Sequence, residues 1–185
     1  MGIGDYSEVI LGEIARVFKY SDFSNSPQLI DDISNAQKIV LAGAGRVGYA
    51  TRGFAMRLGH LGFNAYMLGD ATVPSIGQGD LLIASSGSGE TQTIYDVVKI
   101  AKDNKARIGL VTGNLDSRMG KLADTVILLR APSKTKPLED FISVQPMTTL
   151  NEQALGIFYD SLVLELMGRT GETHDSMWYR HSNLE

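Results

Sequence analysis

The chain has 185 residues, of which 43% are hydrophobic, enough for one compact domain with a buried core. A formal net charge of −4 gives little electrostatic support for a nucleic-acid partner, and the absence of cysteine excludes disulfides, thiolate catalysis and cysteine-based metal sites. The N-terminus has no signal-peptide pattern, and no apolar run approaches the roughly 20 residues that cross a bilayer. We therefore expect a cytoplasmic protein without a membrane partner.

Hydrophobic periodicity predicts two helices before the first strand. The first covers residues 5–20, and a short second helix runs from Pro27 to Ala36, with Ser26 as N-cap and Pro27 at the first helical position. Strands and helices then alternate. The expected strands are 38–42, 64–68, 80–85, 107–112 and 125–129, and the expected helices between them are 46–61, 91–104 and 116–123. This alternation predicts a three-layer α/β sandwich with a five-stranded parallel sheet, in the flavodoxin-like order 2-1-3-4-5.

The C-terminal third of the chain predicts a loop followed by a long helix. Residues 131–147 contain three of the five prolines and charges of both signs, which is typical of a loop or crossover. A helix is expected over 149–168, ending before Gly168 or Gly171, with apolar residues on more than one face. We expect one domain over 1–185, with segments 5–36 and 149–185 in subunit contacts. An ordinary buried helix remains the alternative.

A run of small hydroxylated residues and glycines follows the third expected strand and precedes a helix. Glycines let the backbone close on an anion, hydroxyls donate hydrogen bonds, and unpaired N–H groups at a helix N-terminus supply a positive pole. The loop lacks the lysine of a P-loop, so a small phosphorylated metabolite is favoured over a nucleoside triphosphate. The residues expected to hold its phosphate are Ser86, Gly87, Ser88, Gly89 and Thr91.

Residues 43–48, after the first strand, read GAGRVG and match the dinucleotide-binding fingerprint. Asp70 follows the second strand, roughly where a ribose-binding carboxylate belongs. This match alone favours an NAD-dependent enzyme. Against that hypothesis, two helices precede the first strand and no second domain remains for a reducible substrate. The loop at 85–91 also has no role in a dinucleotide site.

Strand order gives the two loops a common role. In the order 2-1-3-4-5, strands 1 and 3 are neighbours and the loops at their carboxyl ends flank one crevice, where such sheets bind ligands. Loops 43–48 and 85–91 are therefore expected to converge on a single phosphate. Gly45 would contribute backbone, and Arg46 a bidentate guanidinium grip. The alternative for Arg46 is a solvated surface arginine.

The segment Ser86–Thr91 resembles the phosphosugar-binding loop of the sugar isomerase (SIS) domain family. The resemblance implies that Ser86, Ser88 and Thr91 bind a sugar phosphate. Many members carry Ser or Thr in the first loop where this chain has Arg46.

The chain length, residues 145–153 and the ending 180–185 are similar to the 6-phospho-3-hexuloisomerase branch of this family. That resemblance implies interconversion of 3-hexulose 6-phosphate and fructose 6-phosphate, in the ribulose monophosphate route of formaldehyde fixation or pentose synthesis. Members are commonly tetramers, so a homotetramer is expected.

Moving a carbonyl from C3 to C2 needs a base that transfers a proton through a cis-enediol or enediolate, and we expect Glu152 to be that base. Thr149 and Glu152 also have capping-box spacing, which would assign the carboxylate to a backbone N–H instead. Glu90 is the second candidate, with a helix-dipole role as its alternative. His60 or His181 is expected to move the proton between O2 and O3, and the alternative for His60 is a helix C-terminal residue that the dipole favours.

This chemistry requires no metal and no redox cofactor. Two further hypotheses remain open from the sequence. The crevice of a non-catalytic sugar-phosphate sensor would bind the ligand without converting it. Another aldose–ketose isomerase would act on a different sugar phosphate.

Overall fold

The computed structural model of the protein describes residues 2–133, 138 and 140–184. The sheet contains β1 (Ile39–Gly43), β2 (Ala65–Met67), β3 (Leu81–Ser86), β4 (Arg107–Thr112) and β5 (Thr125–Leu128). The helices are α1 (Ile3–Tyr20), α2 (Ser26–Asn35), α3 (Gly45–His60), α4 (Gln92–Asp103), α5 (Thr149–Thr170) and α6 (His174–Tyr179). Within the described residues, no helix combines the length and apolar character needed to cross a membrane.

The sheet has the predicted topology. Its five strands are parallel and lie in the order β2-β1-β3-β4-β5. β1 and β3 are neighbours, with Gly43 paired to Ser85 at their carboxyl ends. The loops that leave these two residues therefore start side by side, at the point where the direction of chain connection reverses.

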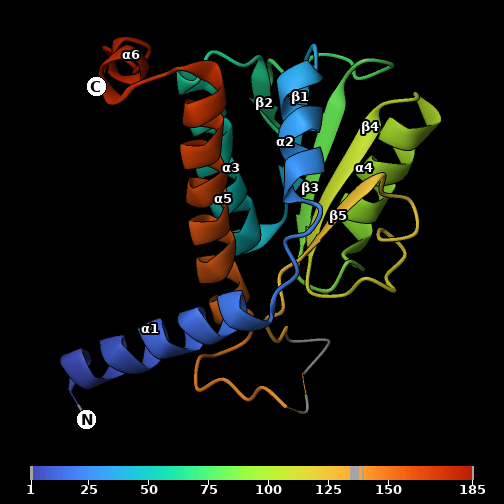
Figure 1. The fold of residues 1–185 in the computed structure, drawn as a ribbon. Helices are drawn as coiled ribbons and strands as arrows, with labels where there is room; N and C mark the ends of the chain where they lie inside the picture. Colours follow the sequence, from blue (N-terminus) through green and yellow to red (C-terminus); the bar gives the residue numbers. More distant parts are fainter. Residues whose placement is uncertain (1, 134–137, 139, 185) are drawn as a thin grey trace.

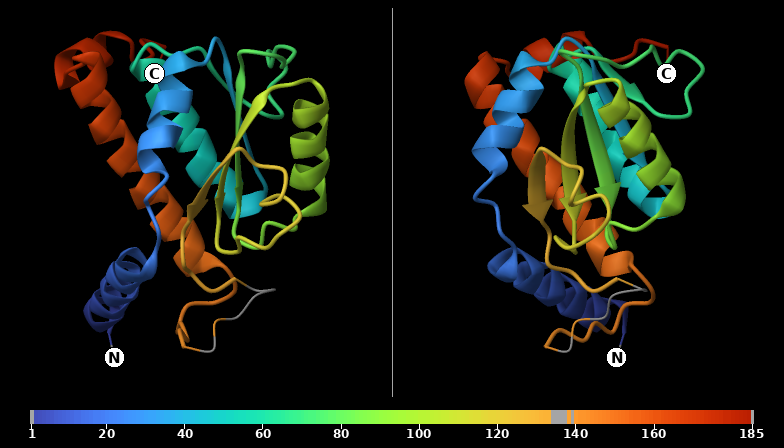
Figure 2. Two further views of the ribbon diagram at one scale, coloured as in Figure 1. Left: turned by 45° about the vertical axis from the view of Figure 1, so that its right-hand side comes forward. Right: turned by 90° about the vertical axis from the view of Figure 1, so that its right-hand side faces the viewer.

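Alternate residues of the central strands bury opposite faces of the sheet, as the two-residue period of a strand requires. Ile39, Leu41, Leu81 and Ile83 point into the core shared with α2, α3 and α5. Their neighbours at even positions in β1 and β3 point toward α4. Figure 2 shows α4 alone on one side of the sheet, with α2, α3 and α5 on the other. The predicted three-layer sandwich is confirmed.

Helix α5 packs against α3 and contributes a buried tyrosine, Tyr159, that contacts both α3 and the carboxyl end of β3. The rings of Phe54 in α3 and Tyr159 in α5 are stacked, with centroids 4.2 Å apart. Such a pair contributes about 0.5–1.5 kcal/mol beyond its buried area. The hydroxyl of Tyr159 is 2.5 Å from Ser85 Oγ, which also receives a hydrogen bond of 3.1 Å from Thr51. Helix α5 is thereby tied to the carboxyl end of β3.

Helix α1 extends away from the sandwich (Figure 1), and only Val17 is fully buried along it. Its apolar residues Ile3 and Leu11 are exposed. Glu13 anchors the crossover before α5, since its carboxylate accepts 2.8 Å and 2.9 Å hydrogen bonds from Val144 N and Gln145 Nε2. One edge of α1 is thus occupied by its own chain, while an apolar surface stays open.

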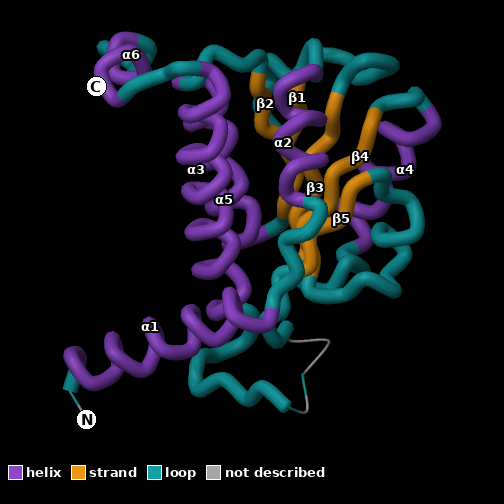
Figure 3. Tube along the Cα trace, viewed as in Figure 1, coloured by secondary structure: helices purple, strands orange, loops and turns teal. Residues whose placement is uncertain are grey.

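The helix predicted over 116–123 is wrong. These residues form consecutive turns between β4 and β5, drawn as loop in Figure 3. Backbone bonds of helical spacing occur only in its second half, from Lys121 N to Ser117 O (3.2 Å) and from Ala123 N to Met119 O (3.0 Å), and Gly120 N donates to Ser117 Oγ at 3.0 Å. Met119 N donates away from the segment, to Gly89 O at 3.3 Å. The segment is therefore shaped by the loop that follows β3.

Smaller differences concern helix ends. Helix α2 begins at Ser26 with Asn25 as N-cap, one residue earlier than predicted. Helix α5 continues through Gly168 and ends before Gly171, whose φ of 71° gives the left-handed C-cap that glycine favours. The tail contains the short helix α6, which was not predicted. The predicted crossover is a loop over the part of 131–147 that the structure describes, while residues 134–137 and 139 lie outside it.

Candidate active site

The two predicted loops meet over one cleft at the carboxyl ends of β1 and β3. The cleft has a volume of about 520 Å³. From the first loop it is lined by Ala44, Gly45, Arg46 and Val47, and from the second by Ser85, Ser86, Gly87, Ser88, Glu90 and Thr91. Ser133, Thr148 and Glu152 complete the wall. Gly89 belongs to the loop but not to the lining.

Three helices begin at this cleft. Gly45 opens α3, Thr91 is the N-cap of α4, and Thr148 is the N-cap of α5. In none of the three helices does the side chain of the N-cap residue (Ala44, Thr91 or Thr148) accept a hydrogen bond from a backbone N–H of the first turn. The N-termini of helices present unpaired N–H groups and the positive end of the helix dipole. The fold therefore concentrates positive potential in the cleft, although the chain as a whole has a net charge of −4.

The loop after β3 presents unpaired donors to the cleft. Within the described part of the chain, the backbone N–H groups of Gly87, Ser88 and Thr91 have no hydrogen-bond acceptor. The hydroxyl oxygens of Ser86 and Thr91 are 3.0 Å apart, and Ser86 Oγ accepts a 3.2 Å bond from Gly89 N. Buried N–H groups are normally paired, so donors left open in a cleft favour an anionic ligand.

Glu152 lies in the first turn of α5 and is paired with Arg46. Arg46 Nε is 2.7 Å from Glu152 Oε2, and the two side chains are 60% and 14% exposed. The capping-box alternative for Glu152 is wrong: Thr148 is the N-cap, and the Thr149 hydroxyl donates to Pro146 O at 2.8 Å. The Glu152 carboxylate is thus directed to the opposite wall of the cleft.

Glu90, the second candidate base, already has partners at both carboxylate oxygens. Arg118 N donates to Oε1 at 2.8 Å and Arg118 Nε donates to Oε2 at 2.6 Å. These hydrogen bonds hold the pKa of Glu90 below its usual value. Both oxygens of Glu90 are thus occupied, whereas within the described residues Glu152 has a cation at Oε2 only, which favours Glu152 as the base.

The two candidate histidines lie together, away from the cleft of their own chain. His60 ends α3, so the helical rise places it about 22 Å along the helix from Gly45 at the cleft. The rings of His60 and His181 have centroids 5.2 Å apart. Figure 1 shows α6 and the C-terminus at the end of α5 opposite α1. A role for either histidine therefore remains a prediction that needs a second subunit.

Residues 32–157 match the family described as SIS domain. The chain belongs to the SIS domain family. It is 38% identical over 181 residues to the 3-hexulose-6-phosphate isomerase of Bacillus subtilis, and the match covers 98% of each chain. The protein of the same name from Mycobacterium gastri is 36% identical over 177 residues, covering 96% of this chain and 88% of that one.

Solved structures agree with this assignment. A crystal structure from Methanococcus jannaschii superposes with a TM-score of 0.82 at 34% identity, covering 98% of this chain and 99% of that one. It is described as a hypothetical protein whose structure infers a molecular function of 3-hexulose-6-phosphate isomerase.

In this SIS domain the glycines of the dinucleotide-like fingerprint have a packing role. A Cβ on Gly48 would lie 2.6 Å from Gly43 O, and one on Gly43 would lie 2.9 Å from Thr51 Oγ1. Both glycines are needed for α3 to start close against β1. Asp70, the expected ribose ligand, is instead ion-paired with Arg52 at 2.8 Å. The fingerprint is thus explained by helix–strand packing, without a dinucleotide.

Sequence reasoning missed several residues of this SIS domain site. Ser133 is buried and lines the cleft from the segment after β5, and Thr148 lines it from the start of α5. The only sequence signal for either is topological, because all parallel strands end at the same edge of the sheet. Arg118 was not singled out because it lies in the segment wrongly predicted as helix.

Acid should detach the C-terminal tail. Arg180 donates to both carboxylate oxygens of Glu172, at 2.6 and 2.8 Å, and with Ser176 it lowers the pKa of Glu172 to about 2 from 4.5. A carboxyl whose pKa is depressed by folding stabilises the folded contact above its unfolded value and loses that contribution as pH falls through its folded value. We therefore expect the tail to loosen between about pH 4.5 and pH 2.

Fluorescence reports this transition directly. Trp178 is the single tryptophan and its ring is stacked on His181 with centroids 5.1 Å apart. Glu172→Gln should shift the emission at neutral pH toward that of the parent at low pH. Glu8→Gln, an exposed change on α1, should leave the emission unchanged. A parental spectrum for Glu172→Gln would contradict this account.

Proposed function

We propose that this SIS domain is a 6-phospho-3-hexuloisomerase, which interconverts 3-hexulose 6-phosphate and fructose 6-phosphate. The observation that carries the proposal is the Glu152 carboxylate, placed in the same cleft as a loop of unpaired N–H donors. Similarity over nearly the full length to proteins named 3-hexulose-6-phosphate isomerase supports the substrate.

In this proposal the substrate phosphate occupies the loop after β3. The N–H groups of Gly87, Ser88 and Thr91 donate to its oxygens, and the Ser86, Ser88 and Thr91 hydroxyls add further hydrogen bonds. Arg46 is 60% exposed at the rim and is paired with Glu152 through Nε, so its Nη groups are the ones that would reach a phosphate oxygen. Gly45 and Gly89 supply backbone conformations with φ of 57° and 67°.

Glu152 then transfers hydrogen between adjacent carbons. As a carboxylate it removes the proton from C2 of the 3-ketose, and the electrons of that C–H bond form the C2–C3 double bond while O3 takes the negative charge. The protonated Glu152 returns the proton to C3, and O2 becomes the carbonyl oxygen. One base on one face of a cis-enediolate is sufficient, because C2 and C3 are directly bonded.

Charge must also move from O3 to O2, by a proton carried between the two oxygens. We assign this step to His181 or His60 of a neighbouring subunit, because both lie far from the cleft of their own chain. The exposed apolar residues of α1 and α5, such as Leu11 and Leu164, are the expected subunit contacts. We accordingly propose a homotetramer of single-domain chains. It would act in the cytoplasm, in the ribulose monophosphate route of formaldehyde fixation.

The test is a coupled assay that supplies 3-hexulose 6-phosphate and follows fructose 6-phosphate. Turnover in solvent D₂O should place deuterium at C3 in the forward direction, as an enediolate route requires. A protein that binds fructose 6-phosphate without converting it would be a sensor, and the proposed function would be refuted. Faster conversion of another ketose phosphate would refute the proposed substrate.

A mixed oligomer tests the histidine assignment. His181→Ala and Glu152→Gln, each inactive alone, should recover activity when the two chains are co-expressed. Because each site would need intact residues from two subunits, about one quarter of the sites should work in an equal mixture. Co-expression of Glu152→Gln with Glu152→Ala is the control and should stay inactive. No recovery in the first mixture would contradict action across the interface.

A further inference from the structure

The turn segment after β4, residues 113–122, lies directly against the phosphate loop, residues 86–91, and donates hydrogen bonds to its successive carbonyl groups. Each of the four successive carbonyl oxygens from residue 87 to residue 90 accepts a hydrogen bond from this segment. The donors are Gly113 N to Gly87 O (2.9 Å), Asn114 Nδ2 to Ser88 O (3.2 Å), Met119 N to Gly89 O (3.3 Å) and Arg118 Nη2 to Glu90 O (3.0 Å).

This arrangement decides which backbone groups face the cleft. A carbonyl oxygen carries negative partial charge and repels an anion, whereas an N–H group attracts it. Because the carbonyl oxygens are bonded on the side of the turn segment, the N–H groups of Gly87, Ser88 and Thr91 remain open to a ligand. The turn segment therefore sets the polarity of the phosphate loop without lining the cleft.

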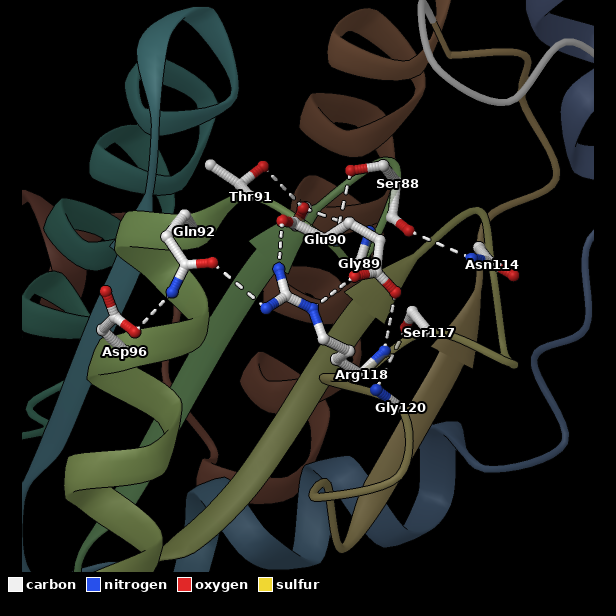
Figure 4. Close-up of polar contacts among 11 residues, drawn as sticks. Ser88, Gly89, Glu90, Thr91, Gln92, Asp96, Asn114, Ser117, Arg118 and Gly120 are labelled. Atoms are coloured by element: carbon white, nitrogen blue, oxygen red, sulfur yellow. Dashed lines mark hydrogen bonds and ion pairs between the residues drawn. The ribbon is translucent and has the colours of Figure 1, made fainter.

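Arg118 makes the most contacts in this segment (Figure 4). Besides the Glu90 carbonyl it donates to both Glu90 carboxylate oxygens, and its Nη1 donates to Gln92 Oε1 at 3.1 Å. Its guanidinium carbon also lies 4.3 Å from the centroid of the Tyr95 ring. One arginine thus joins the loop, the first turn of α4 and the turn segment.

The pairing of Arg118 with Glu90 matters because the Glu90 carboxylate is negatively charged. Glu90 lines the cleft, so an unpaired carboxylate there would repel a phosphate dianion held by the neighbouring amides. Within the described residues Arg118 is the only ion-pair partner of Glu90, and Lys121 acts on the carboxylate more weakly, without a hydrogen bond. Exposed ion pairs contribute little to folding stability, and these two side chains are 44% and 40% exposed. We therefore explain the pairing by its effect on phosphate binding and not by a contribution to folding stability.

We propose that Arg118 is a positioning residue for the phosphate site, which removes the Glu90 carboxylate from competition with the substrate and fixes the loop carbonyl groups away from it. This inference rests on the proposed function, in that the ligand is a phosphate monoester. A lysine at 118 would keep the charge but lose the planar fork that bonds carbonyl and carboxylate together.

Calorimetric titration with inorganic phosphate and with fructose 6-phosphate tests the role. Arg118→Gln should raise the dissociation constant of both ligands at least about tenfold, equivalent to about 1.4 kcal/mol of binding free energy. Glu90→Gln combined with Arg118→Gln should recover binding to within about threefold of the parent, because the repelling charge is gone. Arg169→Gln removes a similarly exposed ion pair, with Asp31 at the far end of α5, and should bind as the parent does.

Kinetics separate positioning from general damage. In Arg118→Gln, KM should rise with the dissociation constant while kcat stays within about threefold, because Glu152 is untouched. Its thermal midpoint should move by no more than about 4 °C. Parental phosphate affinity in Arg118→Gln would overturn the proposal, as would a double variant that binds no better than Arg118→Gln.

The two calorimetric titrations do not require that the protein convert a substrate. A parent that binds inorganic phosphate but converts no sugar would refute the proposed function and leave the Arg118 test in force. A parent that binds neither phosphate nor fructose 6-phosphate would overturn the inference.

Discussion

Replacing Glu152 by glutamine should lower kcat by about a thousandfold while fructose 6-phosphate still binds. Glutamine keeps the size of the side chain but cannot accept the C2 proton. The change also frees Arg46 from its 2.7 Å partner at the rim of the cleft. We therefore expect the dissociation constant for fructose 6-phosphate to stay level or fall. The coupled assay and a calorimetric titration of the same preparation measure the two effects.

Thr149→Ala is the matched control for this prediction. If Glu152 acted through a capping box, Thr149→Ala would cost about 1 kcal/mol of stability, whereas Glu152→Gln would cost little because glutamine also serves at that position. Both variants would then affect turnover only through folding. Because the Thr149 hydroxyl bonds to Pro146 O, we expect that variant to retain parental kcat. Turnover retained in Glu152→Gln would remove Glu152 as the base.

The sheet and its order were predictable because the relevant signals are local. Short apolar runs separated by helical periodicity imply parallel strands with crossover helices, and the order 2-1-3-4-5 is a common solution. Once β1 and β3 are neighbours, the glycine and serine loops that follow them must lie side by side. The Gly43–Ser85 pairing confirms that step. The location of the cleft thus followed from sequence patterns and topology.

The partners of the charged side chains were not predictable in the same way. The Arg46–Glu152 and Glu90–Arg118 pairs join residues far apart in the chain. Local spacing even gave a wrong alternative for Glu152, since its capping-box pattern with Thr149 is present in the sequence but not used. Ion pairs across a cleft depend on loop geometry, which periodicity does not describe.

The helix predicted over 116–123 was wrong for a related reason. It was predicted as the helix that usually connects two parallel strands. In the structure Met119 N donates to Gly89 O and Arg118 N to Glu90 Oε1, so these two N–H groups are not available to a continuous helix. Tertiary contacts outweighed a weak local preference. The misprediction coincides with the part of the chain that we propose to support ligand binding.

Replacing Gly89 by alanine should abolish phosphate binding with a loss of about 2–4 kcal/mol in folding stability. Gly89 has a φ of 67°, where an L-residue is strained, and its added Cβ would lie 2.1 Å from Ser117 Oγ and 2.4 Å from Ser117 Cβ. Ser117 is fully buried, so it has little room to retreat. The loop must shift instead, which displaces the N–H groups of Ser88 and Thr91. Chemical denaturation and phosphate titration measure the two losses.

Two companion variants separate the clash from the backbone strain. Ser117→Gly removes the two nearest atoms and leaves Thr112 Oγ1 at 3.1 Å, so adding it to Gly89→Ala should restore part of the phosphate affinity. The cost of the positive φ, about 1–2 kcal/mol, remains. Gly53→Ala places a methyl group in open space on α3 and should bind phosphate as the parent does, with equal or higher stability. If Gly89→Ala bound phosphate normally, the loop geometry seen here would not be the one that holds the ligand. The open amides of Gly87, Ser88 and Thr91 would then need another explanation.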